Sequence, residues 1–138
     1  MFVTPYLFFN GNCAEALAFY QTAAGAVIDY ATKYGDTPAA EHVPAAIHDK
    51  IINASFRIGD TMIMASDARP DLWTGSPRGV SLCIRADSPS AAETIFAALS
   101  AGGTIDMAMG ETFFAERFGS ATDKFGIEWM VIFEKKHG

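Results

Sequence analysis

An internal repeat constrains the fold of this chain more than any other feature of its sequence. Residues 14–28 read AEALAFYQTAAGAVI and residues 91–105 read AAETIFAALSAGGTI, so that Phe19 aligns with Phe96. Each copy is an Ala-rich amphipathic segment that ends at a small-residue turn, which predicts a helix running into a strand. A duplicated unit of this kind predicts two similar modules related by a pseudo-two-fold axis, with a cleft between them.

A second pair of related segments locates an insertion in the first half. Residues 56–62 and 123–129 each pivot on one glycine and return to a strand-like pattern. The spacing between the copies is about ten residues shorter here than at the helices, which places the insertion between Gly35 and Asp49. Because this stretch holds two prolines and mixed charges, it is expected to be a mobile surface loop.

Alternating and short apolar runs supply the remaining elements. They predict strands at 6–9, 26–33, 50–58, 61–66, 80–85, 104–109, 116–122 and 128–133. Asn12 and Ser88 are expected to cap the two helices through their side chains.

Each half therefore follows the order βαβββ. The predicted fold is α+β, a single domain over residues 1–138 in which tandem modules, about 1–67 and about 80–138, form a cup-shaped mixed sheet. The alternative is a ferredoxin-like dimer, whose βαββαβ order has one strand fewer per half.

Composition excludes several classes of partner. The net charge of −6 and isoelectric point near 4.9 disfavour nucleic acid, whose phosphates require a basic surface. No apolar run approaches the ~20 residues needed to cross a bilayer, and residues 1–9 do not resemble a signal peptide. The two cysteines, Cys13 and Cys83, have no disulfide or zinc spacing, which is typical of a cytoplasmic protein. Cys13, at a helix N-terminus, is expected to be a buried structural thiol.

Motifs along most of the chain resemble those of PhnB-like proteins. These motifs are Pro5–Cys13, Ala14–Tyr20, Arg57–Asp60, Met64–Asp67, Glu111–Phe114, Arg117–Gly119 and Asp123–Met130. PhnB-like proteins belong to the vicinal-oxygen-chelate superfamily, with glyoxalases, extradiol dioxygenases and bleomycin-resistance proteins. The resemblance implies paired βαβββ modules, a homodimer and a small-molecule site inside the cup.

The resemblance does not carry over the metal ligands of that superfamily. The corresponding positions hold Pro5, Ser81 and Met130, and Asn53 stands where PhnB-like relatives often have His. Glu128 lies on the same strand face as Met130, but one carboxylate does not make a metal site. We therefore expect no cofactor.

Two histidines leave a second metal hypothesis open. His42 and His48 lie in the insertion together with Glu41 and Asp49. Pro44 separates the histidines, and their spacing is not that of one helix face. A solvated loop is favoured, although loop metal binding stays an alternative.

The candidate ligand-binding residues come from the polar faces of the predicted strands and from aromatic residues in loops. Arg57 and Arg117 could orient an anionic or carbonyl group, and Met62, Met107, Met109 and Phe113 could add to an adaptable apolar lining. Core packing or surface ion pairs would explain the same residues. The full predicted set is Asn53, Ser55, Arg57, Trp73, Ser81, Cys83, Phe114, Arg117, Glu128 and Met130, with Arg85 on the same strand face as Cys83.

These residues favour a metal-free small-molecule-binding protein with an apolar cup. The alternative is a glyoxalase-, dioxygenase- or lyase-type enzyme that uses an atypical metal or none, and a third possibility is an accessory subunit of a larger complex. PhnB-like proteins are sometimes named methyltransferases, but no strand here leads into a Gly-rich nucleotide-binding turn followed by an acidic residue. Catalytic residues are not identified by the sequence.

Overall fold

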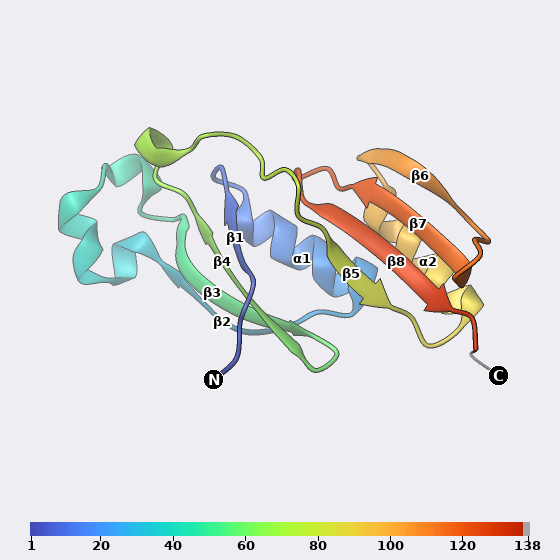
Figure 1. The fold of residues 1–138 in the computed structure, drawn as a ribbon. Helices are drawn as coiled ribbons and strands as arrows, with labels where there is room; N and C mark the ends of the chain where they lie inside the picture. Colours follow the sequence, from blue (N-terminus) through green and yellow to red (C-terminus); the bar gives the residue numbers. More distant parts are fainter. Residues whose placement is uncertain (137–138) are drawn as a thin grey trace. The chain divides into compact units, whose positions relative to one another are not determined.

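The computed structural model describes residues 1–136 and contains the predicted βαβββ order twice (Figure 1). The chain divides into two compact units between Gly75 and Ser76, here called module one and module two. The last two residues of the predicted second module, 137 and 138, lie outside the described part. Module one comprises β1 (Tyr6–Phe9), α1 (Cys13–Ala24), β2 (Val27–Lys33), β3 (Ile51–Ile58) and β4 (Thr61–Asp67). Module two comprises β5 (Leu82–Arg85), α2 (Pro89–Ser100), β6 (Thr104–Gly110), β7 (Ala115–Thr122) and β8 (Glu128–Glu134).

Each module forms its own four-stranded mixed sheet. The strand orders are β1-β4-β3-β2 and β5-β8-β7-β6, so the two sheets have the same topology. In each sheet the first strand pairs in parallel with the last strand of its module, and the other pairs are antiparallel. This arrangement confirms the predicted fold class and excludes the ferredoxin-like alternative.

One face of the first sheet packs against α1. Alternation along the strands turns Phe9, Phe56 and Ile63 inward, and these residues are almost completely buried. Tyr20 of α1 stacks on Phe56 with ring centroids 6.0 Å apart. This apolar contact fixes the helix on one face of the sheet and leaves the other face without a helix from its own module.

Module two uses the same arrangement with a different core. Figure 1 shows α2 behind β7 and β8, and Phe96 of this helix lies directly over Gly119. A Cβ atom on Gly119 would lie 2.8 Å from the Phe96 ring, so the glycine permits this close approach. The burial pattern shifts the alignment of the two helices by one residue. Phe96 corresponds to Tyr20, since both side chains are buried, whereas Phe19 is only half-buried.

The insertion lies between β2 and β3, where it was predicted. Its backbone forms the 3₁₀ turns Tyr34–Asp36, Pro38–His42 and Ala45–Ile47 (cyan in Figure 1), which the sequence pattern did not predict. Nε2 of His48 lies 3.0 Å from the carbonyl oxygen of Ala40, and the Tyr34 hydroxyl donates to the carbonyl of Asp67 at 2.8 Å. These contacts tie the insertion to itself and to the end of β4.

The two helix caps have different outcomes. Ser88 caps α2 as predicted, because its Oγ accepts from the backbone N–H of Ala91 at 3.1 Å. The prediction for Asn12 is wrong, since it stands at the cap position but makes no capping bond through its side chain. Instead, the carboxylate of Asp67 at the end of β4 accepts from the backbone N–H of Cys13 at 2.9 Å.

Among the described residues, neither α1 nor α2 is long and apolar enough to cross a membrane.

Candidate functional site

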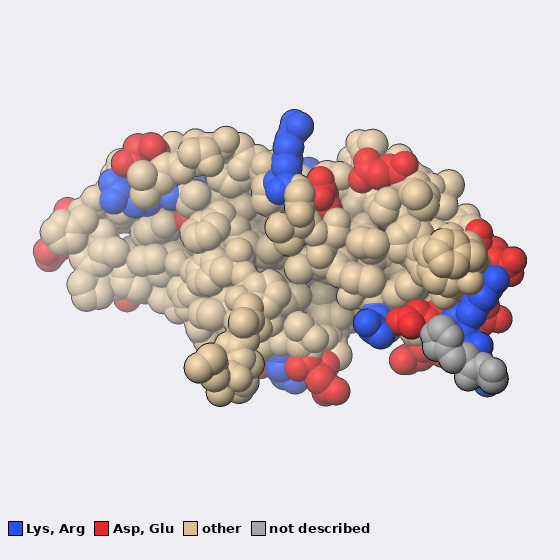
Figure 2. All heavy atoms as spheres, viewed as in Figure 1, with Lys and Arg blue, Asp and Glu red and all other residues tan. Residues whose placement is uncertain are grey.

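The helix-free face of each sheet carries a row of four side chains in register. The central pair is the same in both modules, a methionine beside a serine, whereas the residues on the outer strands differ. The rows are Tyr6, Met64, Ser55 and Tyr30 in module one, and Cys83, Met130, Ser120 and Met107 in module two. Charged side chains lie mainly around the margins of the view in Figure 2, with wide uncharged areas between them.

In module one, an amide lies between two tyrosines on this face. The Tyr30 hydroxyl donates to Oδ1 of Asn53 at 2.8 Å, and Nδ2 of Asn53 donates to the Tyr6 hydroxyl at 3.0 Å. The network crosses the sheet, because Tyr30 is on β2, Asn53 on β3 and Tyr6 on β1. Both tyrosines remain accessible, with 46% of Tyr30 and 39% of Tyr6 exposed.

Apolar side chains lie on the same face of the sheet as this network. The rings of Tyr6 and Phe8 lie 4.9 Å apart at an interplanar angle of 31°. Phe8 is 53% exposed and Met62 is 44% exposed, whereas Ser55 is only 3% exposed. A few polar groups within an apolar and aromatic surface is the composition typical of small-molecule sites.

Arg57 lies on the same strand as Asn53 and is held by Asp29. Its Nε lies 3.1 and 3.2 Å from the two carboxylate oxygens, and a terminal nitrogen lies 3.1 Å from one of them. The hydrogen bond and the charge of Asp29 raise the pKa of the Arg57 guanidinium. The pair is therefore neutral overall, although it is solvent-accessible.

Among the described residues of module two, no hydrogen-bonded side chains bridge the whole sheet. On the corresponding face the Thr122 hydroxyl of β7 donates to the Asp106 carboxylate of β6 at 2.9 Å. Cys83 is exposed, and burial of part of its side chain together with the charge of Glu134 raises the pKa of its thiol, while Arg85 acts in the opposite direction. The pKa shift favours the neutral thiol, which is a weak nucleophile. Arg85 pairs with Glu134 at 2.8 Å.

The predicted aromatic residues lie at different places. Phe114 contacts Phe113 and Phe118, with ring centroids 5.1 and 5.3 Å apart, in the segment leading into β7. Phe113 is 91% exposed. Trp73 is half-buried just after the 3₁₀ turn Pro70–Leu72, which is a part of module one. The structure therefore does not place Trp73 and Phe114 in the same module.

A family model described as 3-demethylubiquinone-9 3-methyltransferase matches residues 2–132. The chain belongs to this family, which is the PhnB-like family. It is 38% identical over 137 residues to protein YjdN of Escherichia coli K12, covering 94% of this chain and 92% of YjdN.

Solved structures show that this PhnB-like chain shares the fold of a glyoxalase and bleomycin-resistance domain. Protein PA1353 from Pseudomonas aeruginosa matches with a TM-score of 0.88 and 39% identity, covering 99% of both chains. The PhnB protein from Bacillus cereus matches with a TM-score of 0.80 and 24% identity, over 96% of this chain and 99% of the other. A glyoxylase/bleomycin resistance protein/dioxygenase domain from Frankia shares the fold, with a TM-score of 0.68, 14% identity and 98% coverage of both chains.

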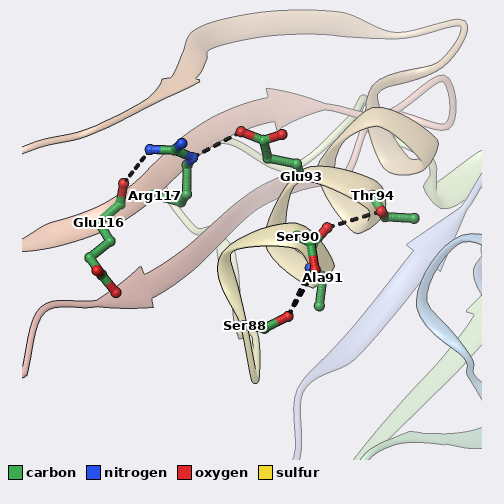
Figure 3. Close-up of polar contacts among 7 residues, drawn as sticks. All are labelled: Ser88, Ser90, Ala91, Glu93, Thr94, Glu116 and Arg117. Carbon is green, nitrogen blue, oxygen red and sulfur yellow. Dashed lines mark hydrogen bonds and ion pairs between the residues drawn. The ribbon is translucent and has the colours of Figure 1, made fainter.

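Arg117 lies on a different face from most of the predicted site residues of this PhnB-like protein. Its Nε donates to the Glu93 carboxylate of α2 at 2.8 Å, and a terminal nitrogen donates to the carbonyl of Glu116 at 2.8 Å (Figure 3). The next residue along β7, Phe118, pairs with Ile132 and lies on the helix-free side. The structure therefore gives Arg117 an ion pair with the covering helix.

Metal-ligating side chains do not cluster within residues 1–136. No group of three or more His, Cys, Asp or Glu in this part of the chain could hold a metal ion. Glu128 stands at the start of β8, where it pairs with Thr122, and Ser81 is exposed just before β5. His48 is occupied by carbonyl groups of its own loop.

Sequence reasoning identified Asn53 but missed both of its partners. Tyr6 and Tyr30 lie on the outer strands β1 and β2, 47 and 23 residues from Asn53 in sequence. The available signal was the strand alternation, since Leu7 and Phe9 turn toward the helix and leave Tyr6 and Phe8 on the opposite face. The alternation that assigns faces to residues 50–58 also assigns Tyr6, in residues 6–9, to the helix-free face.

Proposed function

We propose that this chain is a small-molecule-binding protein whose ligand site includes the helix-free face of module one. The observation that carries the proposal is the Tyr30–Asn53–Tyr6 network. Its polar groups are oriented by one another and remain accessible on the same face as Phe8 and Met62. Ordering three side chains over an exposed sheet has an entropic cost, and a ligand that uses the prepared groups avoids that cost at binding.

The proposal extends to the state of the protein. In line with the family resemblance, we propose that it acts in the cytoplasm as a homodimer. Light scattering on the purified protein would test the dimer.

The activity in the family description is not supported by the local sequence. The turn from β1 into α1, residues 10–12, holds the single glycine Gly11, whereas a dinucleotide-binding turn of the Rossmann type uses three glycines.

The experiment is a thermal-shift screen of small metabolites against the wild type and two asparagine variants. Asn53→Leu removes the bridging amide, and Asn12→Leu is the matched control because the Asn12 side chain makes no capping bond. Compounds that bind the proposed face are expected to raise the melting temperature of the wild type and of Asn12→Leu, but not of Asn53→Leu. Stabilisation that persists undiminished in Asn53→Leu would contradict this site.

A further inference from the structure

We infer that the helix-free face of module one selects uncharged aromatic molecules that carry a carbonyl oxygen, which accepts hydrogen bonds from Tyr6 and Asn53. This inference rests on the proposed function and specifies its ligand class. It depends on three properties of the face: the direction of its hydrogen bonds, its charge, and the shape of its apolar part.

The direction of the hydrogen bonds leaves donors facing a ligand. A tyrosine hydroxyl has one hydrogen, and that of Tyr30 is used on Oδ1 of Asn53. The Tyr6 oxygen is an acceptor in this network, because Asn53 donates to it through one of its two amide hydrogens. The network therefore does not use the hydrogen of the Tyr6 hydroxyl or the second amide hydrogen of Asn53. A ligand group that complements both is an acceptor.

The charge of the face disfavours an anionic acceptor. Arg57 is the cation on β3, four residues from Asn53 and about 13 Å along the strand. Its guanidinium is engaged by both carboxylate oxygens of Asp29, so the positive charge is compensated. A carboxylate ligand would lose hydration without meeting an unpaired cation here, whereas a neutral carbonyl loses less.

The apolar neighbours favour a flat ligand body. Phe8 and Tyr6 form a tilted pair whose rings are accessible, and Met62 lies on the same face of the adjacent strand β4. Aromatic rings stack or meet edge-to-face with a gain beyond that of buried area alone, and a thioether adapts to either geometry. An aromatic ring that bears a carbonyl would place its acceptor near the donors.

The test uses three probes of one shape and different charge: acetophenone, benzoate and benzamidinium. Binding is followed by NMR on protein labelled with ¹³C at its methionine methyl groups. Met62 and Met64 report on module one, and Met107, Met109 and Met130 report on module two. Acetophenone is expected to shift the Met62 and Met64 signals with a dissociation constant at least about three-fold lower than those of the two charged probes.

Two matched variants then test the direction of the hydrogen bonds. Tyr6→Phe and Tyr30→Phe remove the same atom from opposite ends of one network. Tyr6→Phe removes a donor to the ligand and is expected to weaken acetophenone binding about three- to ten-fold, whereas Tyr30→Phe weakens it less than about two-fold. Both tyrosines are accessible, so neither change is expected to unfold the protein.

The outcomes separate the two proposals. If none of the three probes shifts Met62 or Met64, the proposed site itself is wrong. If benzoate or benzamidinium binds this face more tightly than acetophenone, the site stands and the inferred ligand class is wrong. Equal losses in Tyr6→Phe and Tyr30→Phe, or a larger loss in Tyr30→Phe, would overturn the assignment of Tyr6 as the donor.

Discussion

Asp67 is the side chain whose removal should most clearly destabilise module one. Its Oδ1 accepts from the backbone N–H of Cys13 at the start of α1, and its Oδ2 accepts from the backbone N–H of Ile51 at the start of β3, both at 2.9 Å. Only 2% of Asp67 is exposed, so water cannot replace these bonds. The carboxylate thereby joins the ends of three elements that are distant in sequence.

The expected loss of stability follows from the hydrogen bonds that the Asp67→Asn side chain can still make. The amide keeps one oxygen for one N–H group, but its NH₂ group faces the other N–H, so two donors meet in a buried site. A hydrogen bond to a charged group contributes ~1.5–3 kcal/mol, and an unsatisfied buried polar group costs ~1–3 kcal/mol. Because these terms partly overlap, the expected loss is about 2–4 kcal/mol, or roughly 10 °C in melting temperature for a chain of this length.

Urea unfolding monitored by circular dichroism measures this loss, with Asn12→Ala as the comparison. An Asn side chain that caps a helix contributes ~1 kcal/mol. Since the Asn12 side chain makes no such bond, Asn12→Ala is expected to change the unfolding free energy by less than about 0.5 kcal/mol. A loss of 1 kcal/mol or more in Asn12→Ala together with a smaller loss in Asp67→Asn would refute the reasoning.

Two further predictions concern packing and pH. Gly119→Ala places a methyl group against the Phe96 ring and is expected to lower the unfolding free energy by about 1–3 kcal/mol. The control Gly110→Ala meets no atom closer than 4.0 Å and should have little effect. Equal changes of the two variants in thermal melts would contradict this prediction. Burial, with a smaller effect of Asp67, raises the pKa of the Cys13 thiol from 9.0 to about 12. The neutral thiol therefore contributes stability that is complete below about pH 9 and is lost as the pH rises toward 12, because only the unfolded thiol ionises in that window. Wild type should lose more stability than Cys13→Ala between pH 8 and 11 in urea titrations, by up to about 1.4 kcal/mol per pH unit.

The fold was predictable because its signals are local or repeated. Apolar and polar residues alternate along residues 50–58, which predicts a strand with one apolar face, since the side-chain period of a strand is two. Gly25 ends α1 at a positive φ of 67°, and Gly102, two residues after the end of α2, has a φ of 77°. Such values favour glycine. Because the chain is duplicated, the element order of one half supports that of the other. A segment with an ambiguous pattern in one module could therefore be assigned from its copy.

The cap and the site were less predictable because they depend on contacts between distant residues. Asn12 satisfies every local rule for a cap, yet the Cys13 N–H bonds to Asp67, 54 residues further along the chain. Similarly, the Tyr6 hydroxyl bonds to Asn53 across 47 residues. No periodicity encodes which carboxylate or amide reaches a given N–H or hydroxyl, since that depends on the strand order β1-β4-β3-β2.

The two in-register rows show where duplicated modules are free to diverge. The central positions, Met64 beside Ser55 and Met130 beside Ser120, lie on inner strands with neighbours on both sides, so substitutions there disturb packing across the whole sheet. The end positions lie on outer strands with a neighbour on one side only, and these are the positions that differ. Tyrosines at both ends reach an amide in module one, whereas Cys83 and Met107 leave module two without that polar bridge. On this argument the ligand chemistry of the chain is set at the outer strands, and exchanging Tyr6 and Tyr30 for the residues of the second row should remove the network while retaining the fold.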